Sequence, residues 1–287
     1  MPKSRHPIFR TLWWSCNLLL IAAFLGVLFA GLREFSLRYY LDGFSDAIAP
    51  GVLPAEPKVQ AILDWMRMEP SRAVATSPDT LSQRDPHVTL NYQQLLRVCG
   101  TATNAFLNLA REDDLVVRRL LLLGLDGNTK HVVAEVLLDQ RWIVVDPTFH
   151  TIMKDAQGRL LTRQDLQNPA LFQQAVSSIP NYPPDYNYEH TTHVRLERVP
   201  FFAKLHLRRF LDAIYPGWDG AADWSLLLER ESFFYLALAS VATLLLLLLR
   251  FMLGRHADSR LRIRRLRLRD RVLRAGSALL SAPEIEQ

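Results

Sequence analysis

Two long runs without a charged residue dominate the hydropathy pattern of the chain. The first covers residues 11–31, and the second covers residues 232–249 and is followed by Arg250 and three further apolar residues. A helix of about 20 apolar residues crosses the hydrocarbon core of a bilayer. The second run is apolar on every helical face, which argues against a buried core helix. We therefore predict membrane-spanning helices over residues 11–32 and 232–253.

A cleaved signal peptide is the alternative interpretation of the first run. The apolar core of the run is longer than the usual span of about 7–15 residues in a signal peptide. The segment "LFAG" at its end is also a poor cleavage site, because such sites need small residues at fixed spacing. We therefore favour an uncleaved anchor.

Charged residues around the two runs set the expected orientation. Lys3, Arg5 and Arg10 precede the first run, and an Arg-rich tail follows the second. Because Lys and Arg stay on the cytoplasmic side of membrane spans, both termini are predicted to be cytoplasmic, at a bacterial inner membrane. The predicted organisation is a cytoplasmic N-terminus (1–10), a first span (11–32), a periplasmic segment (33–231) with a core at about 55–195, a second span (232–253) and a cytoplasmic tail (254–287).

The net charge of +5 comes from the ends of the chain. Residues 33–231 contain 21 Lys and Arg against 25 Asp and Glu, which gives this segment a net charge of −4. Basic residues beside membrane spans indicate contact with anionic lipid headgroups, or with a cytoplasmic partner. The expected partners are therefore membrane lipid, a periplasmic protein or peptide substrate, and a membrane or envelope protein. A nucleic acid is not expected.

Between the two spans, the spacing of apolar residues predicts helices first and an antiparallel sheet afterwards. Helical periods lead up to Pro70 and run from Cys99 to Leu109. Strands are predicted over residues 115–124 and on both sides of a turn at residues 139–140. This order of elements indicates an α+β fold.

Two segments follow the predicted sheet. Residues 181–190, "NYPPDYNYEH", are typical of an irregular loop rich in Pro and Tyr. Residues 201–218, "FFAKLHLRRFLDAIYPGW", predict an amphipathic helix close to the second span. Such a helix either packs on the domain or lies in the lipid headgroup region, and the sequence leaves both alternatives open.

Cys99 is the only cysteine of the predicted periplasmic segment, because the other cysteine, Cys16, lies in the first span. Cysteines in an oxidising compartment normally pair as disulfides, so an unpaired one needs another explanation. At the start of a helix, the dipole and the free N–H groups favour a thiolate. A reactive thiol is one interpretation of Cys99, and a buried structural cysteine is the alternative.

The predicted hairpin brings a histidine and an aspartate together. With a two-residue turn at residues 139–140, Val133 pairs with Asp146, and His131 lies diagonally from Asp146 on the same face. Diagonal neighbours are about 7–8 Å apart at the backbone, within reach of an imidazole. A three-residue loop would break this parity. The alternatives are a solvent-facing histidine at the strand end and an aspartate that ends the strand before Pro147.

These segments together resemble the transglutaminase-like superfamily. The resemblance rests on "VCGTATNAFLNLA", "HVVAEV" and "RWIVVDPTF", and covers about residues 90–150. It implies a papain-like α+β domain with a Cys–His–Asp triad. In that triad Cys99 is the nucleophile, His131 the general base and acid, and Asp146 the residue that orients His131. The chain departs from the family at residues 111–114, "REDD", where a Gly-containing turn is common.

The predicted function is that of a membrane-anchored thiol enzyme. It would carry out acyl transfer or hydrolysis at amide bonds of a periplasmic or envelope substrate. The alternative is a non-catalytic scaffold or binding module of the same fold in an envelope assembly. No cofactor is expected, and no metal, because His150, His190 and His193 have no acidic or Cys partner at a zinc-site spacing.

Overall fold

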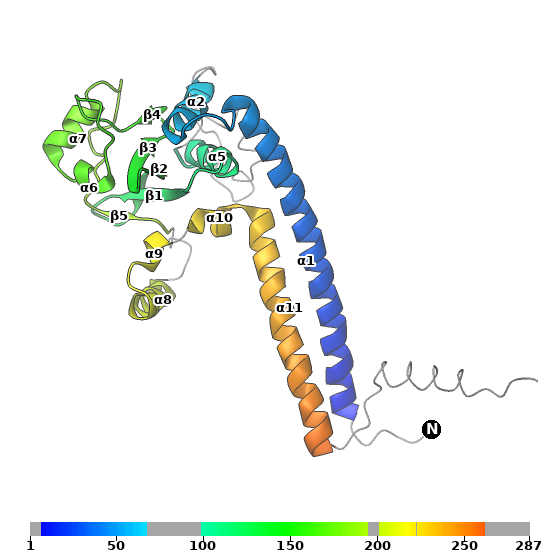
Figure 1. The fold of residues 1–287 in the computed structure, drawn as a ribbon. Coiled ribbons are helices and arrows are strands. Elements are labelled where there is room, and N and C mark those ends of the chain that lie inside the picture. The colour runs from blue at the N-terminus through cyan, green and yellow to red at the C-terminus, as the bar shows by residue number, and fades with distance from the viewer. Residues whose placement is uncertain (1–6, 68–98, 195–200, 222, 262–287) are drawn as a thin grey trace, which may run out of the picture. The chain divides into compact units, whose positions relative to one another are not determined.

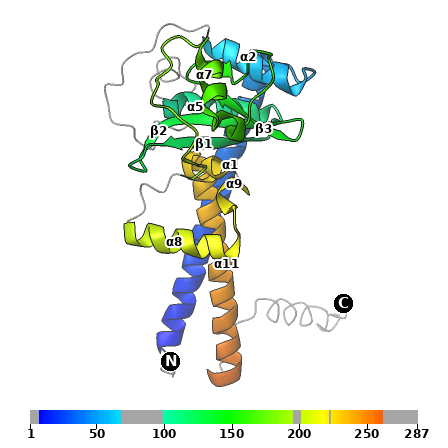
Figure 2. The same cartoon turned by 90° about the vertical axis from the view of Figure 1, so that its left-hand side faces the viewer.

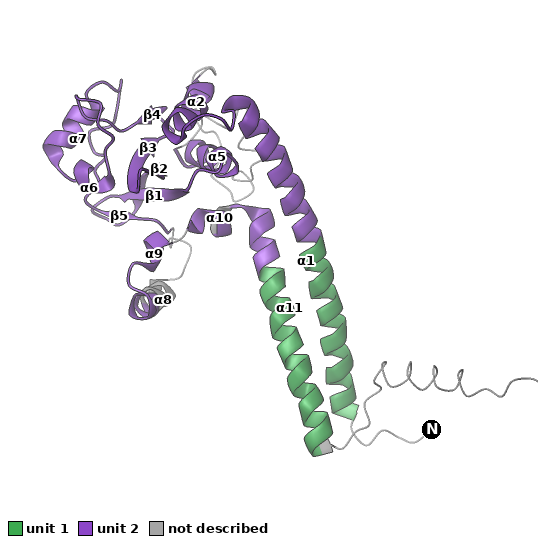
Figure 3. Cartoon of the chain, viewed as in Figure 1, with its two compact units in different colours: residues 1–28, 238–287 green, residues 29–237 purple. Residues whose placement is uncertain are grey.

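The structure is a computed structural model that describes residues 7–67, 99–194, 201–221 and 223–261. The chain divides into two compact units, shown in Figure 3. The first combines Met1–Leu28 with Leu238–Gln287, and the second is Phe29–Ala237. Most of the Arg-rich tail lies outside the described residues.

The first unit contains the apolar parts of two long helices. These helices are α1 (Pro7–Ile48) and α11 (Glu231–His256), and α11 continues into a short π-helix, η2 (Ala257–Leu261). Both are long and apolar enough to cross a membrane. Their apolar side chains point outward, as in Leu18, Phe24, Leu244 and Leu248. A soluble core helix buries such side chains, so this exposure favours lipid as their surroundings.

Polar contacts join the two helices within this unit. Arg250 Nε donates a hydrogen bond to Asn17 Oδ1 at 2.8 Å, and the guanidinium of Arg250 lies 5.4 Å from the ring centre of Trp13. Cys16 donates a longer, weaker bond to the carbonyl of Leu246. Cys16 is therefore a buried, unpaired thiol, in agreement with a structural role for this cysteine.

The second unit has an α+β fold, as predicted (Figures 1 and 2). Its sheet has the strand order β4-β3-β2-β1-β5, and every neighbouring pair is antiparallel. The strands are β1 (Val117–Leu123), β2 (Thr129–Leu138), β3 (Arg141–Asp146), β4 (Thr151–Ile152) and β5 (Thr191–Thr192). The helices are α2 (Ala55–Arg67), α5 (Cys99–Glu112), α6 (Arg163–Leu166), α7 (Pro169–Val176), α8 (Phe201–Ile214), α9 (Trp218–Ala221) and α10 (Trp224–Glu229).

The two faces of the sheet bury separate apolar clusters, because successive strand residues point to opposite faces. On one face, Ala134 and Val136 pack with Phe106 of α5 and with residues of α2. On the other face, Val133 and Val144 pack with a cluster that includes Phe172 and Tyr188. The first cluster also includes Leu37, Leu41 and Ala49, so it extends N-terminal to residue 55.

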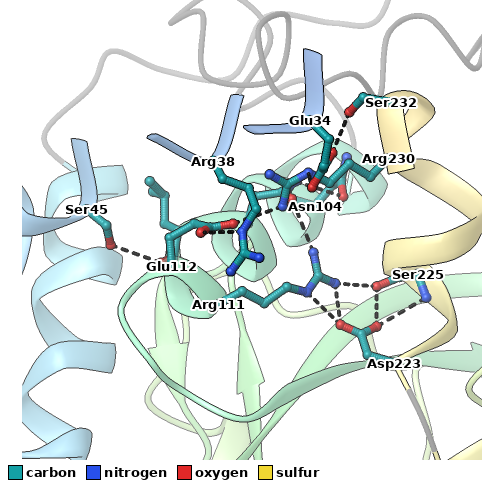
Figure 4. A network of polar contacts seen from close by, with 12 residues as sticks. Glu34, Arg38, Ser45, Asn104, Arg111, Glu112, Asp223, Ser225, Arg230 and Ser232 are labelled. Carbon is teal, nitrogen blue, oxygen red and sulfur yellow. Dashed lines mark hydrogen bonds and ion pairs between the residues drawn. The ribbon is translucent and has the colours of Figure 1, made fainter. Parts of the chain in front are cut away.

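Helix α5 ends in a set of buried ion pairs (Figure 4). Arg230 is the centre of the largest group: its Nη1 donates to Glu112 Oε1 at 2.9 Å, and its Nε lies 3.1 Å from Glu34 Oε1. Ser232 donates to Glu34 at 2.6 Å, and Arg38 donates to Glu112 at 3.2 Å. The end of α5 is thus joined to α1 and to the segment that enters α11.

The neighbouring residues of "REDD" make further buried pairs. Arg111 donates at 2.6 Å to Oδ2 of Asp223, which is the N-cap residue of α10. Lys58 of α2 donates to Asp113 Oδ1 at 2.8 Å. These residues were a departure from the resembled family, and in the structure they tie α5 to three other elements. A buried charge is tolerated only when it is paired, which explains why Arg111, Glu112 and Asp113 each have a partner of opposite charge.

Replacing Arg230 by Leu should destabilise the fold strongly, because Glu34 and Glu112 would remain buried without a counter-charge. Loss of one partner from a buried ion pair costs about 3–5 kcal/mol of unfolding free energy. Denaturant titration of the full chain in detergent measures it. The control is Lys154→Leu, which removes a pair with Glu56 in which both side chains are well exposed and should leave the midpoint almost unchanged. Equal midpoints for the two variants would contradict a stabilising role for the Arg230 cluster.

Candidate active site

The β2–β3 hairpin places His131 and Asp146 on one face of the sheet. Its turn is the two-residue turn at 139–140, with φ angles of 46° and 63°. Positive φ at both central positions gives a turn whose twist matches that of the flanking strands. Ala134 pairs with Val145, which is the register expected from the sequence. The predicted turn and register are confirmed.

His131 and Asp146 form a buried pair. Nε2 of His131 and Oδ2 of Asp146 are 2.7 Å apart, and both side chains are fully shielded from solvent. The alternative of a solvent-facing histidine is therefore wrong. Oδ1 of Asp146 accepts hydrogen bonds from the backbone N–H groups of Thr148 and Phe149 at 3.0 and 3.3 Å. Asp146 thus both contacts His131 and accepts hydrogen bonds from the turn that follows its strand.

Two tyrosines complete the surroundings of this pair. The ring of Tyr186 stacks on the imidazole of His131, with ring centres 4.2 Å apart and an interplanar angle of 12°. The hydroxyl of Tyr182 donates to Asp146 Oδ2 at 3.2 Å. Sequence reasoning missed both residues and treated residues 181–190 as a loop without a role. The high content of Tyr and Pro in that loop was the sequence feature that could have indicated a contact with the site.

Cys99 is the first described residue of α5, and its thiol is half-buried. The start of α5 is held to β2, because Thr103 Oγ1 donates to the carbonyl of Val132 at 2.9 Å. Nε2 of His131 contacts Asp146, which leaves Nδ1 as the second ring nitrogen. Nδ1 is therefore the atom of His131 that is available to the Cys99 thiol.

The electrostatics of the site favour a charged Cys–His pair. Burial raises the pKa of Cys99, but its interaction with His131 outweighs burial, so the pKa lies below the ordinary value of 9.0. Burial alone would lower the pKa of His131, but the charge and hydrogen bond of Asp146, together with Cys99, raise the pKa to about 9. Both shifts stabilise a thiolate beside an imidazolium. The structure thus brings together all three predicted site residues.

The other histidines that the sequence analysis considered as metal ligands have different contacts. His193 Nε2 lies 2.9 Å from Glu135 Oε2, which also accepts from Arg118 at 2.6 Å. The backbone carbonyl of His150 accepts from Arg67. In the part of the chain that the structure describes, no three His, Cys, Asp or Glu side chains are grouped so as to hold a metal ion. His193 is therefore part of a buried charge cluster of its own.

Comparisons with known proteins add little to this geometry. No protein-family model matches the chain, and no curated protein matches its sequence. One solved structure, a protein from Cytophaga hutchinsonii described provisionally as a cysteine protease, is similar with a TM-score of 0.33 and 19% sequence identity. The similarity covers 43% of this chain and 40% of that one. The structure itself shows an α+β domain with a buried His131–Asp146 pair near a half-buried Cys99, and two long apolar helices.

Removing the imidazole should make Cys99 less reactive. In a Cys16→Ser background, His131→Ala leaves burial and the charge of Asp146, which both raise the pKa of Cys99, opposed only by the backbone hydrogen bond with Val132. The pKa of Cys99 should therefore rise. Alkylation by iodoacetamide at pH 7 should slow by about tenfold or more, since each pKa unit changes the thiolate fraction tenfold. The matched control is His193→Ala, which removes a histidine that contacts a different buried carboxylate. Equal rates in the parent and in His131→Ala would contradict the assigned contact.

Asp146→Asn should lower the pKa of His131 from about 9 toward its ordinary value, because the main cause of the increase is lost. Folding raises this pKa above the unfolded value of 6.5. Protonated His131 therefore stabilises the fold fully below pH 6.5, and that contribution disappears as the pH rises through about 9. Histidine-selective NMR titration measures the pKa, with the signal assigned by its absence in His131→Ala. An unchanged titration near pH 9 in Asp146→Asn would exclude Asp146 as the cause.

Proposed function

We propose that this protein is a thiol enzyme that cleaves or exchanges amide bonds through a Cys–His–Asp triad. One observation carries the proposal: His131 is buried between the carboxylate of Asp146 and the thiol of Cys99, and the pKa values of Cys99 and His131 shift toward the charged pair. Perturbed pKa values of this kind concentrate at catalytic sites. An inert core cysteine does not require a buried histidine with its own carboxylate.

The chemistry follows the roles of an activated nucleophile. The Cys99 thiolate attacks the amide carbonyl carbon, and the protonated His131 donates its proton to the departing nitrogen as the carbon–nitrogen bond breaks. This leaves a thioester on Cys99. Water, or a second amine, then attacks the thioester carbon while His131 takes the proton from the attacking group. The carbon–sulfur bond breaks and returns the Cys99 thiolate beside the protonated His131. Water gives hydrolysis and an amine gives transamidation.

Asp146 and Tyr182 act on the orientation of the imidazole in this proposal. The bond from Nε2 to Asp146 leaves Nδ1 facing the thiol, and the hydroxyl of Tyr182 holds the same carboxylate oxygen. The stacked ring of Tyr186 limits rotation of His131. The proposed domain is transglutaminase-like and papain-like, on the strength of the motif order in the sequence and of this geometry.

The proposed setting is a bacterial inner membrane with both termini in the cytoplasm. The two apolar helices and the basic flanks of the spans support it. The triad domain is then periplasmic. Proteins of the envelope and peptidoglycan stem peptides carry the amide bonds within its reach, and they are the proposed substrates. Membrane lipid and an envelope protein are the proposed partners.

An acyl-transfer assay with the full chain in lipid nanodiscs tests the proposal. Peptidoglycan stem peptides and glutamine-containing peptides are supplied with a biotinylated primary amine, and both free acid and amine adduct are measured. Cys99→Ser should abolish both products. Asp146→Asn should lower turnover by about 10²–10⁴-fold, as is typical for loss of general acid–base catalysis.

The control for that assay is Asp139→Asn, which makes the same carboxylate-to-amide change in the β2–β3 turn. Asn tolerates the positive φ of that position, so turnover should be unchanged. Products that persist in Cys99→Ser would show that another group is the nucleophile. Absence of turnover together with an ordinary, His131-independent thiol would favour the non-catalytic scaffold instead.

A further inference from the structure

Helix α8 exposes apolar side chains that an amphipathic helix normally buries. Phe210, Ile214 and Tyr215 are 61%, 64% and 57% exposed. Phe210 and Ile214 are four residues apart, so they lie on the same side of the helix. The sequence left open whether this helix packs on the domain. In the structure, these side chains do not pack on it.

The opposite side of α8 provides its attachment. Asp212 lies about half a turn around the helix from Phe210 and Ile214, and its Oδ1 accepts a hydrogen bond from Trp218 Nε1 at 2.9 Å. Trp218 is buried and packs edge-on against Trp224, whose Nε1 donates to the Trp218 carbonyl. Figure 2 shows α8 beside α9 and outside the layers around the sheet. Among the described side chains of α8, Asp212 is thus joined to α9, while Phe210 and Ile214 on the opposite side are exposed.

We propose that α8 lies in the headgroup region of the membrane, with Phe210, Ile214 and Tyr215 inserted at the acyl boundary. The proposal rests on the membrane spans of the proposed function, but not on the triad chemistry. Three observations select lipid as the partner. The apolar side chains are exposed together, aromatic residues lie among them, and the helix sequence has three basic residues against one acidic residue. A helix with these properties binds an anionic lipid surface.

Chain connectivity supports the same partner. Only α9, α10 and short connections separate α8 from Glu231, the first residue of α11. That helix is one of the two candidate spans. The α9–α10 segment is fixed by contacts with the domain, through Arg118 to the Gly220 carbonyl at 2.6 Å and through Arg111 to Asp223. Helix α8 is thus held within a short distance, along the chain, of the point where α11 begins.

Spin-label accessibility in the full chain tests this inference. The chain carries Cys16→Ser and Cys99→Ser and is reconstituted in nanodiscs of phosphatidylcholine and phosphatidylglycerol. A single label is placed by Phe210→Cys. Its matched control, Arg209→Cys, lies one residue away on the polar flank of the same helix. A third label, Leu248→Cys, reports on the exposed side of α11.

The label at residue 210 should collide with oxygen several-fold more readily than with the water-soluble nickel reagent, relative to the label at residue 209. Accessibility to nickel that is equal at both positions would place α8 in water and overturn the inference. Shielding of residue 210 from both reagents would show a protein contact, such as a second copy, and would also overturn it. A label at residue 248 that collides freely with nickel would instead disprove the membrane span itself. That result is distinguishable from a failure of α8 alone.

Discussion

Helix α5 has the Cys99 thiol at one end and three consecutive ion-paired residues at the other, and the geometry of the site depends on how firmly this helix is held. Each buried charge costs several kcal/mol to remove from water, and only a partner at hydrogen-bond distance offsets that cost. Glu112 and Arg111 therefore permit few positions of α5 relative to α1 and α10. Because α5 is rigid, the pairs at its C-terminal end also restrict where Cys99 lies.

Shielding from water, which makes the ion pairs at the end of α5 strong, also strengthens the electrostatic interactions in the candidate site. Burial opposes both charged forms of the Cys99–His131 pair, yet each group stabilises the charge of the other, and Asp146 adds to the effect on His131. In water these interactions would be weak, whereas in a site without solvent they determine which atom carries the proton. A buried carboxylate with a histidine partner is costly for stability. The aromatic rings of Tyr182 and Tyr186 exclude the water that would weaken it.

Local sequence patterns predicted the helix and strands on which Cys99, His131 and Asp146 lie. They did not predict contacts between segments that are distant in the sequence. The turn at residues 139–140 determines the register of one hairpin, so alternation along two adjacent strands was sufficient to place His131 beside Asp146. The tyrosine loop has no periodicity, and its contact with His131 depends on the fold of the whole domain. The pairing of Glu34 with Arg230 joins helices almost 200 residues apart, as the Glu34–Ser232 separation of 198 also shows. Residue spacing along a helix or strand does not predict a contact between residues that are so far apart in the sequence.

The "REDD" segment shows how the site and the membrane-proximal chain are connected. Compared with the family that the sequence resembles, it is a departure at the end of the helix that begins at Cys99. In the structure it contacts residues of α1 and of the segment that leads into α11, all within the unit that contains the triad. A Gly-containing turn has no side chains with which to make these contacts. The charged segment therefore joins the helix that begins at Cys99 to α1 and to the segment that enters α11, within the second unit.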